Sequence, residues 1–450
     1  MDLQGKRAVV IGLGRSGIAA ARLLLEKGAR VVGTDAAARE RLSPEAIDLE
    51  KAGATLAVGG HDPAIFSDVD LIVISPGVPP FAAVLEAESR GVPVIGEMEL
   101  ASRFVTAPIV LIGGTNGKST TTALVFEMLS RAGKKTFVGG NFGTPLAEVT
   151  REPWDAIVLE ISSFQAERVP TLHARVHALL NVTDDHLDRY PSFEAYAHAK
   201  GNPFERMTED DVAVIPFGDP IVAREAARGK ARPVTFSVEI ENHQADVAVS
   251  GGAILDRFKG SSYPLNLLRI AGSHNIANAC AAIACAAALG ANPDAIASAL
   301  RSFEGLGHRT VLVAEIAGVR YYDDSKGTNV GASVAALRGL AEPKAVLIAG
   351  GRDKLGDYAP LIAALRAKGR ALVLLGEAAP RIAEAATGVL PVVRADSMAG
   401  AVRAAHGLAT PGDAVLLSPA CSSFDMFRDY KDRGDAFVRA VRDLSQEVGP

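Results

Sequence analysis

A lysine and two hydroxyl residues behind a glycine-rich turn are the residues of this chain best suited to chemistry. The turn and these side chains are Gly114, Thr115, Asn116, Gly117, Lys118, Ser119 and Thr120. An apolar run at 109–112 precedes the turn, and an amphipathic helical pattern at 121–132 follows it. Glycines let backbone N–H groups approach phosphates, the helix N-terminus adds partial positive charge, and lysine neutralises phosphate oxygens. The segment predicts a cradle for a nucleoside triphosphate, with Mg²⁺ on a hydroxyl.

The cradle departs from the usual eight-residue phosphate-loop pattern, because the first glycine of that pattern falls on Ile112. The alternative is a glycine-rich turn that joins a strand to a helix and binds nothing. Such a turn does not require a lysine, a serine and a threonine at the helix start, so we favour the phosphate cradle.

Carboxylates follow two later apolar runs of the same region. Glu160 ends the run at 157–160, and an acid at such a strand end commonly helps a phosphate-loop hydroxyl, here Ser119, to hold Mg²⁺. The run at 176–180 leads into a cluster of Asp184, Asp185, His186 and Asp188. Beside a triphosphate this cluster indicates a second metal or substrate shell. A strand-capping carboxylate and a solvated loop are the simpler alternatives.

A second glycine-rich turn lies near the N-terminus. Glycines at 12, 14 and 17 follow an apolar run at 8–11, and Asp35 ends the next run, 18 residues after the last of them. Such a turn commonly places a nucleotide diphosphate at the helix start and a ribose hydroxyl on the acid. It would serve a dinucleotide or a UDP-sugar, and Ser75 lies on another loop of the same edge. The alternative is a turn that only packs helix on strand.

Short Val, Ile and Leu runs alternate with helical patterns almost throughout, which predicts α/β domains with mostly parallel sheets. We divide the chain into three blocks, 1–96, 97–304 and 305–450. The runs expected to form strands are 8–11, 30–34, 71–74 and 92–95, then 109–112, 157–160, 176–180 and 212–215, then 345–349, 371–376 and 414–418. A β-rich insertion is expected near 246–255.

The composition is that of a soluble globular protein with room for about three domains. Of the 450 residues 48% are hydrophobic, and the net charge of −5 leaves no general basic surface for nucleic acid. The chain opens on an expected strand rather than a signal peptide, and the alanine-rich stretch at 279–291 is too short to span a bilayer. We expect a cytoplasmic protein that binds neither membranes nor nucleic acid. Three cysteines suit no disulfide framework, and Cys280 and Cys285 should pack in the core.

Further motifs are spread over nearly the whole chain. They are GTNGKST at 114–120, LEISSFQ at 159–165, NVTDDHLDRY at 181–190, SHN at 273–275, HR at 308–309, DDSKGTN at 323–329, GGRDK at 350–354 and SPACSSFDMF at 418–427. This set resembles the Mur ligases, and several of its motifs are shared with folate polyglutamate ligases. The last motif and the glycine-rich first block resemble the branch that adds D-glutamate.

The resemblance implies a Rossmann-like N-terminal domain for a UDP-sugar, a central phosphate-loop ATPase-like domain and a Rossmann-like C-terminal α/β domain for an amino acid. It implies a ligase that uses ATP and two Mg²⁺ ions to join D-glutamate to UDP-N-acetylmuramoyl-L-alanine through an acyl phosphate, in peptidoglycan precursor synthesis. We expect a monomer.

The resemblance also implies roles for single residues. For ATP, these are the turn residues above with Asn275, Arg309 and Asp324; for catalysis, Lys118, His186, Lys200 and Arg309. For Mg²⁺, they are Ser119 and Glu160 on one ion, and His186 with a carbamylated Lys200 on the other. For the UDP-sugar peptide, they are Gly14, Arg15, Ser16, Asp35, Ser75, Asn141 and Lys326. For D-glutamate, they are Thr328, Lys354, Ser423, Phe424 and Tyr430.

The chain departs from the family pattern in two places. Residues 201–207 bring Gly and Pro where the family continues as a helix, and these residues disfavour a regular helix. Tyr430 stands where a phenylalanine is common.

Other functions explain less of the sequence. A nicotinamide-dependent oxidoreductase would use the N-terminal turn but leave Lys118 and Glu160 idle. A phosphate-loop switch or motor would use Lys118 and Glu160 but not the first and third blocks. The nearest rival is another Mur ligase or a folate polyglutamate ligase.

Overall fold

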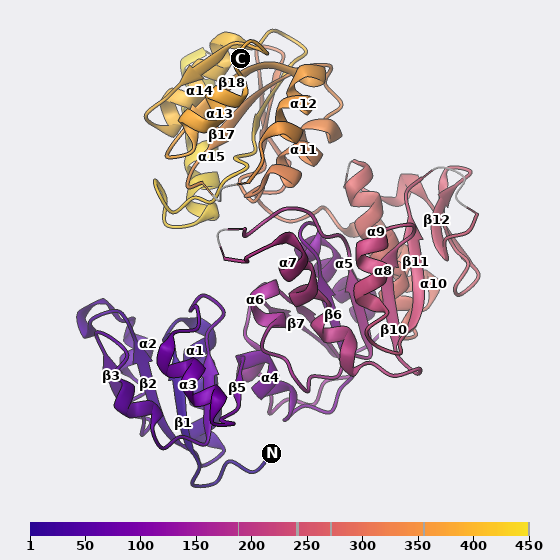
Figure 1. Ribbon diagram of the computed structural model, residues 1–450. Coiled ribbons are helices and arrows are strands. Elements are labelled where there is room, and N and C mark those ends of the chain that lie inside the picture. Colours follow the sequence, from indigo (N-terminus) through magenta and orange to yellow (C-terminus); the bar gives the residue numbers. More distant parts are fainter. Residues whose placement is uncertain (188, 240–242, 271, 354–355, 449–450) are drawn as a thin grey trace.

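The structure is a computed structural model that describes residues 1–187, 189–239, 243–270, 272–353 and 356–448. It contains three α/β units, each built on its own sheet (Figure 1). The N-terminal unit and the C-terminal unit form separate lobes on the central one. The expectation of three α/β domains with mostly parallel sheets is confirmed.

The N-terminal unit has a five-stranded parallel sheet in the order β3-β2-β1-β4-β5. Its strands are β1 (Arg7–Ile11), β2 (Arg30–Asp35), β3 (Thr55–Val58), β4 (Leu71–Ile74) and β5 (Val94–Ile95). Its helices are α1 (Arg15–Glu26), α2 (Pro44–Ile47) and α3 (Ala82–Ser89), with 3-10 turns η1 (Arg39–Arg41) and η2 (Pro63–Phe66). Helix α4 (Glu97–Ser102) follows and packs against α1, so one apolar core continues from this unit into the central one.

The central unit has a nine-stranded sheet in the order β14-β13-β12-β11-β10-β9-β6-β8-β7. Its strands are β6 (Ile109–Gly113), β7 (Thr136–Gly140), β8 (Ala156–Glu160), β9 (Val176–Leu179), β10 (Val212–Pro216), β11 (Arg232–Ser237), β12 (Val247–Ser250), β13 (Ala253–Asp256) and β14 (Ser261–Pro264). Its helices are α5 (Lys118–Arg131), α6 (Ser163–Ala166), α7 (Phe193–Gly201), α8 (Pro220–Ala226), α9 (Ser273–Ala288) and α10 (Pro293–Ser302), with η3 (Leu146–Glu148), η4 (Asn202–Arg206) and η5 (Leu265–Leu267).

Alternation along the central strands places helices on both faces of the sheet. Val214 of β10 joins the core under α5, α9 and α10, whereas its neighbours Ala213 and Ile215 join the core under α7 and α8. Cys280 and Cys285 pack in the first of these cores as expected. The expected β-rich insertion is an antiparallel extension, β12 to β14, of the same sheet.

The C-terminal unit has a six-stranded sheet in the order β15-β16-β20-β17-β18-β19, in which β15 alone runs antiparallel to its neighbour. Its strands are β15 (Val311–Ile316), β16 (Val319–Asp323), β17 (Ala345–Gly350), β18 (Gly369–Leu375), β19 (Val392–Arg394) and β20 (Ala414–Leu417). Its helices are α11 (Val330–Gly339), α12 (Ala359–Lys368), α13 (Ala379–Ala385), α14 (Met398–Leu408) and α15 (Tyr430–Val448).

The apolar runs found in the sequence coincide with the buried central strands, although several ends shift by a residue or two. The run at 92–95 forms only the two-residue strand β5, and helix α5 starts at Lys118 rather than after Thr120. Strands with more polar or shorter patterns, such as β3 and β15, were not expected. Among the described helices, none combines the length and apolar character that a membrane span requires.

Candidate active site

The glycine-rich turn between β6 and α5 has the geometry of a phosphate loop. Gly114 and Gly117 adopt positive φ angles of 134° and 85°, which side chains rarely tolerate. A Cβ at Gly117 would lie 2.2 Å from Oδ1 of Asn278, so glycine is also needed for space. The Lys118 Nζ donates to the carbonyl oxygens of Gly114 at 2.9 Å and Thr115 at 2.8 Å.

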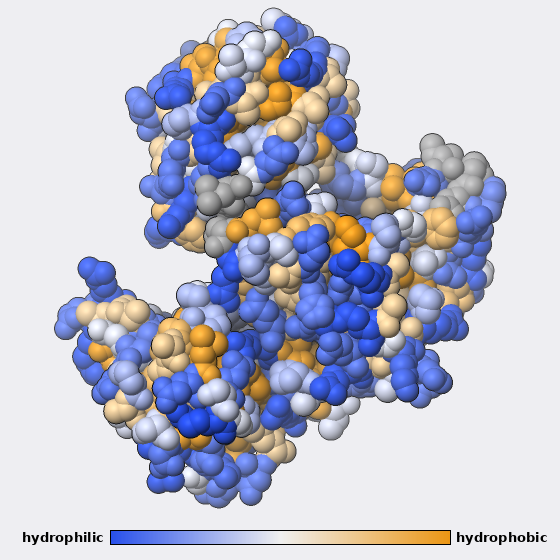
Figure 2. All heavy atoms as spheres, viewed as in Figure 1, coloured by the Kyte–Doolittle hydropathy of each residue, from blue (hydrophilic) through white to orange (hydrophobic). Residues whose placement is uncertain are grey.

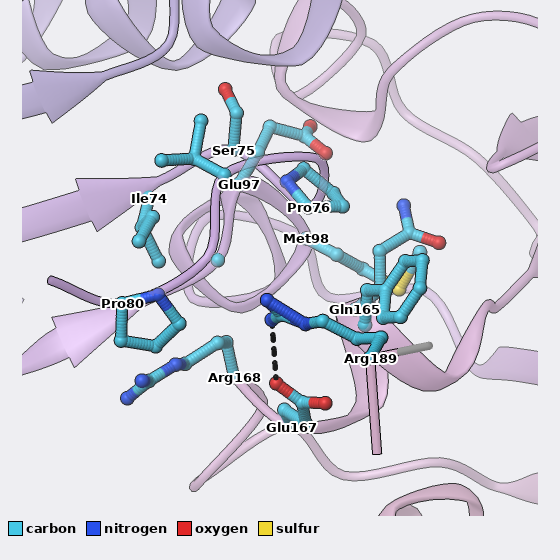
Figure 3. Close-up of a pocket in the computed structure, with 13 residues that line it drawn as sticks. Ile74, Ser75, Pro76, Pro80, Glu97, Met98, Gln165, Glu167, Arg168 and Arg189 are labelled. Atoms are coloured by element: carbon cyan, nitrogen blue, oxygen red, sulfur yellow. Dashed lines mark hydrogen bonds and ion pairs between the residues drawn. The ribbon is translucent and has the colours of Figure 1, made fainter. Parts of the chain in front are cut away.

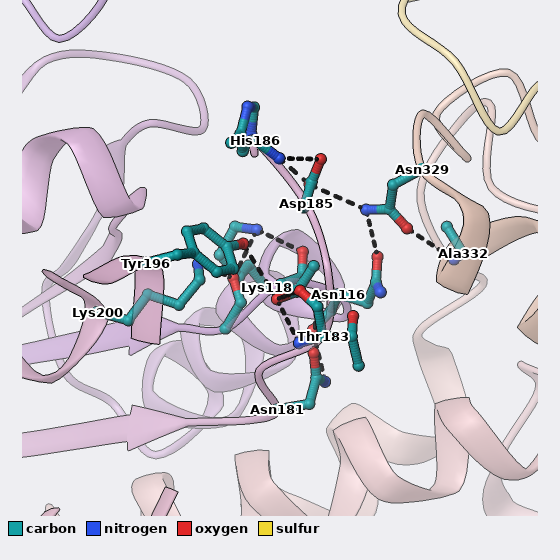
Figure 4. Close-up of polar contacts among 12 residues, drawn as sticks. Asn116, Lys118, Asn181, Thr183, Asp185, His186, Tyr196, Lys200, Asn329 and Ala332 are labelled. Atoms are coloured by element: carbon teal, nitrogen blue, oxygen red, sulfur yellow. Dashed lines mark hydrogen bonds and ion pairs between the residues drawn. The ribbon is translucent and has the colours of Figure 1, made fainter. Parts of the chain in front are cut away.

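Residues of the loop after β9 and of α7 fix this turn (Figure 4). The Asn181 Oδ1 accepts from the Asn116 N–H at 2.9 Å, and its Nδ2 donates to the Asn116 carbonyl at 3.1 Å. The Thr115 hydroxyl accepts from the Thr183 N–H at 3.0 Å and lies 3.1 Å from the Tyr196 hydroxyl. Strand β9 is the direct neighbour of β6, so its end is placed to hold the turn.

The strand on the other side of β6 brings a buried carboxylate to the helix start. The Ser119 hydroxyl donates to Oε2 of Glu160 at 2.5 Å, and Nδ2 of Asn141 donates to Oε1 at 2.5 Å. Burial alone would raise the pKa of Glu160, but Lys118, the hydrogen bonds from Ser119 and Asn141, and Arg309 together lower it. Glu160 is therefore ionised in a cleft rich in positive charge.

Lys200 approaches the same turn from α7. Its side chain is buried, and Nζ donates to the Gly114 carbonyl at 2.8 Å and lies 4.6 Å from the centre of the Tyr196 ring. Burial, with the nearby charge of Lys118, lowers the pKa of Lys200 well below its ordinary value, while Asp185 and Glu160 oppose the shift. The helix ends at Gly201 and continues as the 3-10 turn η4, as the Gly and Pro residues there predicted.

His186 lines the cleft in a strained backbone conformation. Its φ is +56°, its Nε2 lies 3.6 Å from Oδ2 of Asp185, and its ring meets Phe164 edge-on at 4.9 Å. The predicted cluster therefore brings Asp185 and His186 together near the turn. Asp188 lies outside the described residues.

Arg309 brings a side chain of the C-terminal unit into the site. Its Nη2 donates to the Ser119 hydroxyl at 2.8 Å. Asp324, which follows β16, is buried and accepts from the Ser418 hydroxyl at 2.6 Å and from Thr310. Burial raises the pKa of Asp324 to about 7. Asn275, in the first turn of α9, accepts from Asn278 at 3.3 Å and faces the cleft.

The candidates for the amino-acid pocket follow three neighbouring strands of the C-terminal sheet. Thr328 follows β16, and Ser423, which is buried, follows β20 with the exposed Phe424. Lys326 places Nζ 3.8 Å from the centre of the Tyr430 ring. Lys354 follows β17 but lies outside the described residues.

The glycine-rich turn after β1 is held by the side chains of Asp35 and Ser75, which hydrogen-bond its backbone. The Asp35 carboxylate accepts from the N–H groups of Leu13 at 2.7 Å and Ala37 at 2.8 Å, and the Ser75 hydroxyl donates to the Gly12 carbonyl at 2.7 Å. The exposed residues Gly14 and Arg15 precede the part-buried Ser16 at the start of α1. The structure does not bring these residues into contact with the phosphate loop.

A narrow cleft lies between the N-terminal unit and the central one (Figure 3). Ser75, Pro76 and Pro80 line it from one side, and Gln165 and Arg168 line it from the other. Glu97 also lines the cleft; its carboxylate is buried and accepts from the Ala147 N–H at 2.6 Å.

A much larger cleft of about 1260 Å³ runs between the three units, and a space-filling view shows the hollow between the two outer lobes (Figure 2). The predicted site residues that line it are Thr115, Asn116, Gly117, Lys118, Ser119, Thr120, Asn141, Glu160, His186, Lys200, Asn275, Arg309, Asp324, Lys326, Thr328, Ser423, Phe424 and Tyr430. Pro76, Gly77 and Pro79 line it from the N-terminal unit. Gly14, Arg15, Ser16, Asp35 and Ser75 do not line it.

Three Mur ligase domain families match the chain, one after another along the sequence. They are the MurD-like N-terminal domain over 6–96, the middle domain over 112–286 and the glutamate ligase domain over 308–421. A UDP-N-acetylmuramoylalanine--D-glutamate ligase from Syntrophotalea carbinolica is 46% identical over 447 residues, 98% of this chain and 99% of that protein. The chain belongs to the Mur ligase family. A protein of the same name from Geotalea daltonii is 44% identical over 99% of both chains.

The fold of this Mur ligase is also similar to that of a solved structure. The pseudomurein peptide ligase type C from Methanothermus fervidus has a TM-score of 0.61 at 20% identity, with 99% of this chain and 100% of that chain covered. The order and the folds of the three domains are therefore shared.

The donor set of this Mur ligase suits Mg²⁺ bound together with a phosphate. Mg²⁺ prefers oxygen ligands and commonly binds through one or two protein groups, phosphate oxygens and water. The Ser119 hydroxyl and the Glu160 carboxylate meet at the helix start and provide such oxygens. Among the described residues no cluster of three or more His, Cys, Asp or Glu forms a cage for a metal.

Three polar residues of this Mur ligase were not singled out in the sequence: Asn181, Tyr196 and Asn329. The first two support the phosphate loop, and Asn329 reaches it from the C-terminal unit. Asn181 and Asn329 each stand just beyond or before a regular element, where an asparagine most often caps or turns the chain. Asn181 begins the motif at 181–190 and Asn329 ends the motif at 323–329, but neither residue has a role predicted from the sequence.

Proposed function

We propose that this chain uses ATP to join D-glutamate to UDP-N-acetylmuramoyl-L-alanine, with release of ADP and phosphate, in the synthesis of a peptidoglycan precursor. The observation that carries this proposal is the cleft shared by all three units, in which the phosphate loop faces Ser423, Lys326 and the loop of Gly77. An enzyme that couples ATP to the joining of two other molecules needs such a meeting point. The relatives at 44–46% identity, named for this activity, support it.

The chemistry requires an activated carboxyl group, because a carboxylate is a poor electrophile towards an amine. The terminal carboxylate of the UDP-linked substrate attacks the γ-phosphorus of ATP, which gives an acyl phosphate and ADP. The amine of D-glutamate then attacks the carbonyl carbon, an amide bond forms, the amine loses a proton, and phosphate leaves.

Lys118 and Arg309 stabilise the negative charge that gathers in both steps. Their side chains reach the start of α5 from the loop itself and from the C-terminal unit. Preorganised cations in a cleft partly shielded from water stabilise a developing charge more than solvent does. We assign Gly114, Thr115, Asn116, Gly117, Thr120, Asn275 and Asp324 to the other contacts with ATP.

Magnesium ions would neutralise and orient the phosphates. We assign Ser119 and Glu160 to one ion, and His186 with a carbamylated Lys200 to a second. Lys200 is buried beside the Gly114 carbonyl, and a carbamate on its Nζ would present anionic oxygens to the cleft. Arg309 already donates to Ser119, so it is placed to contact a phosphate bound to the first ion.

We place the two other substrates on the outer units. The UDP-sugar peptide is assigned to the block at 1–96, and the residues for it are Gly14, Arg15, Ser16, Asp35 and Ser75, with Asn141 and Lys326 nearer the reacting end. D-glutamate is assigned to the block at 305–450, on Thr328, Lys354, Ser423, Phe424 and Tyr430. ATP is assigned to the block at 97–304. We further propose that the enzyme is a monomer, because each unit contributes to one cleft within a single chain. We also propose that it acts in the cytoplasm.

Phosphate release in the presence of different amino acids tests the proposal. The purified protein, ATP and Mg²⁺ are assayed with each UDP-linked precursor and with L-alanine, D-glutamate, L-lysine or meso-diaminopimelate. We expect release only with UDP-N-acetylmuramoyl-L-alanine and D-glutamate together. Release with another pair would identify a different Mur ligase, and release with a folate substrate and L-glutamate would identify a folate polyglutamate ligase. Release without any acceptor would indicate an ATPase.

A further inference from the structure

Asn329 joins the C-terminal unit to two loops of the central unit through one side-chain amide (Figure 4). Its Nδ2 donates to Oδ1 of Asn116 at 3.1 Å and to Oδ2 of Asp185 at 3.2 Å. Its Oδ1 accepts from the Ala332 N–H at 2.8 Å and thereby caps α11. The side chain is 7% exposed, so these contacts are shielded from water.

The start of α11 lies very close to the phosphate loop. A Cβ added at Gly331 would lie 3.2 Å from Nδ2 of Asn116 and 3.4 Å from the Thr183 hydroxyl. The first separation is tighter than ordinary van der Waals contact, so a side chain at Gly331 would press on Asn116. Glycine at this position allows the approach that brings Asn329 within hydrogen-bond reach.

The contact with Asn116 reaches a rigid part of the phosphate loop. Both the N–H and the carbonyl of Asn116 are bound by Asn181, so the peptide cannot move without breaking those hydrogen bonds. Asp185 precedes His186, whose backbone is held at a positive φ. Asn329 therefore connects the cradle for the phosphates to the loop that carries His186.

We propose that Asn329 is a positioning residue that sets the phosphate loop and the Asp185–His186 loop in register when the C-terminal unit docks on the central unit. The proposal rests on the function proposed above, because register matters where ATP and the acyl acceptor must meet. An asparagine suits this role, since its two N–H groups serve two acceptors while its oxygen keeps the helix cap. An aspartate would lack these donors and would face the Asp185 carboxylate.

Asn329→Ser keeps the helix cap but removes the two contacts between the units. Serine caps a helix about as well as asparagine but has no amide to reach Asn116 and Asp185. We expect kcat for D-glutamate-dependent phosphate release to fall about tenfold, since two hydrogen bonds that position the loops are lost. The affinity for ATP alone should stay within about twofold, because the phosphate loop keeps its own supports from Asn181.

Asn292→Ser is the matched control. Asn292 caps α10 through an Oδ1 contact to the Ala295 N–H at 2.8 Å, away from the cleft. The same substitution there should leave kcat within about twofold, since it exchanges one good cap for another. Wild-type kcat in Asn329→Ser, or a loss matched by Asn292→Ser, would overturn the proposal.

A double-mutant cycle with Asn116→Ala tests whether the two side chains act as a pair. We expect the double variant to be no more than about twofold slower than the slower single variant, because either change removes the shared contact. Losses that multiply would mean that the two residues act independently, and the proposal would fall.

Hydrogen exchange of the substrate-free protein separates this proposal from the proposed function. We expect faster exchange over 114–120 and 183–187 in Asn329→Ser than in wild type or Asn292→Ser. Unchanged exchange in both segments would overturn the positioning role even if kcat fell. If Asn329→Ser exchanged faster than wild type in these segments but wild type gave no D-glutamate-dependent phosphate release, the proposed function would fail and the connection would stand.

Discussion

Two glycine-rich turns in this chain have the same local structure but lie in different electrostatic environments. Each turn follows a parallel strand and opens a helix, α1 in one case and α5 in the other. Each is also fixed by side chains from a neighbouring strand end. Asp35 and Ser75 hold the first turn, and Asn181 holds the second.

The difference lies in the charges around each turn. Four buried or part-buried charged groups lie around the second turn: Lys118, Glu160, Lys200 and Arg309. The first turn has the exposed Arg15 at its helix start. Holding a diphosphate requires mainly backbone N–H groups, whereas transferring a phosphoryl group also requires stabilisation of charge that develops during reaction. Chemistry is therefore expected only at the second turn.

Two buried carboxylates show the same contrast. Glu97 lies between the N-terminal and central units, and burial, with a smaller contribution from Glu148, raises its pKa to about 7. Glu160 is equally buried, yet Lys118, its hydrogen bonds and Arg309 lower its pKa. Lys118 and Arg309, the cations that favour the ionised form of Glu160, lie at the phosphate loop.

Lys118→Ala should have the largest effect of the changes that test this contrast. Removal of one preorganised cation at a developing charge should lower kcat about a hundredfold to a thousandfold, or about 3–4 kcal/mol. The thermal midpoint should barely change, because the loop keeps its contacts to Asn181 and Thr183. Steady-state kinetics and thermal unfolding check this. Near-normal turnover in a folded variant would remove the distinction between the two turns.

Glu97→Gln should change the pH dependence of stability. The folded pKa of about 7 lies above the ordinary value of 4.5, so the native state keeps a proton that the unfolded state releases. Wild type therefore loses stability as the pH rises from about 4.5 to 7. At pH 8 the glutamine variant should be more stable by up to about 3 kcal/mol, and at pH 4 the two should be equal.

Urea unfolding of both proteins at pH 4 and pH 8 measures the effect, with Glu160→Gln as the matched control. That control should show no gain at pH 8, because the cations beside Glu160 favour its ionised form. A gain in both variants would mean that the two carboxylates do not differ in the way described.

Asp35→Asn should have the smallest effect, and only on the UDP-linked substrate. The variant loses the charge and one acceptor that hold the Leu13 and Ala37 N–H groups. The KM for UDP-N-acetylmuramoyl-L-alanine should rise several-fold, about 1 kcal/mol, while kcat and the KM for ATP stay unchanged. An equal rise in the KM for ATP would show that the two turns are not separate sites.

Local sequence patterns predicted the elements whose residues form a continuous apolar run or carry a helix-start signal. The apolar runs at 71–74 and 109–112 became buried strands, and the predicted helix after the phosphate turn became α5, although it starts three residues earlier, at Lys118. Such runs are fixed by the burial of both sheet faces between helices, which requires only apolar side chains in a row. Short or polar strands such as β3 and β15 carry too little of this pattern.

The sequence by itself identified a lysine, a serine and an acid that suit a triphosphate. It could do so because turn geometry and helix ends depend on neighbouring residues. Tertiary structure alone decided that Lys200 lies against Gly114, that Arg309 reaches Ser119 and that Asn329 reaches Asn116. These pairs are separated by 86, 190 and 213 positions in the chain. Their contact depends on strand order and on how the units pack, and no local pattern encodes either.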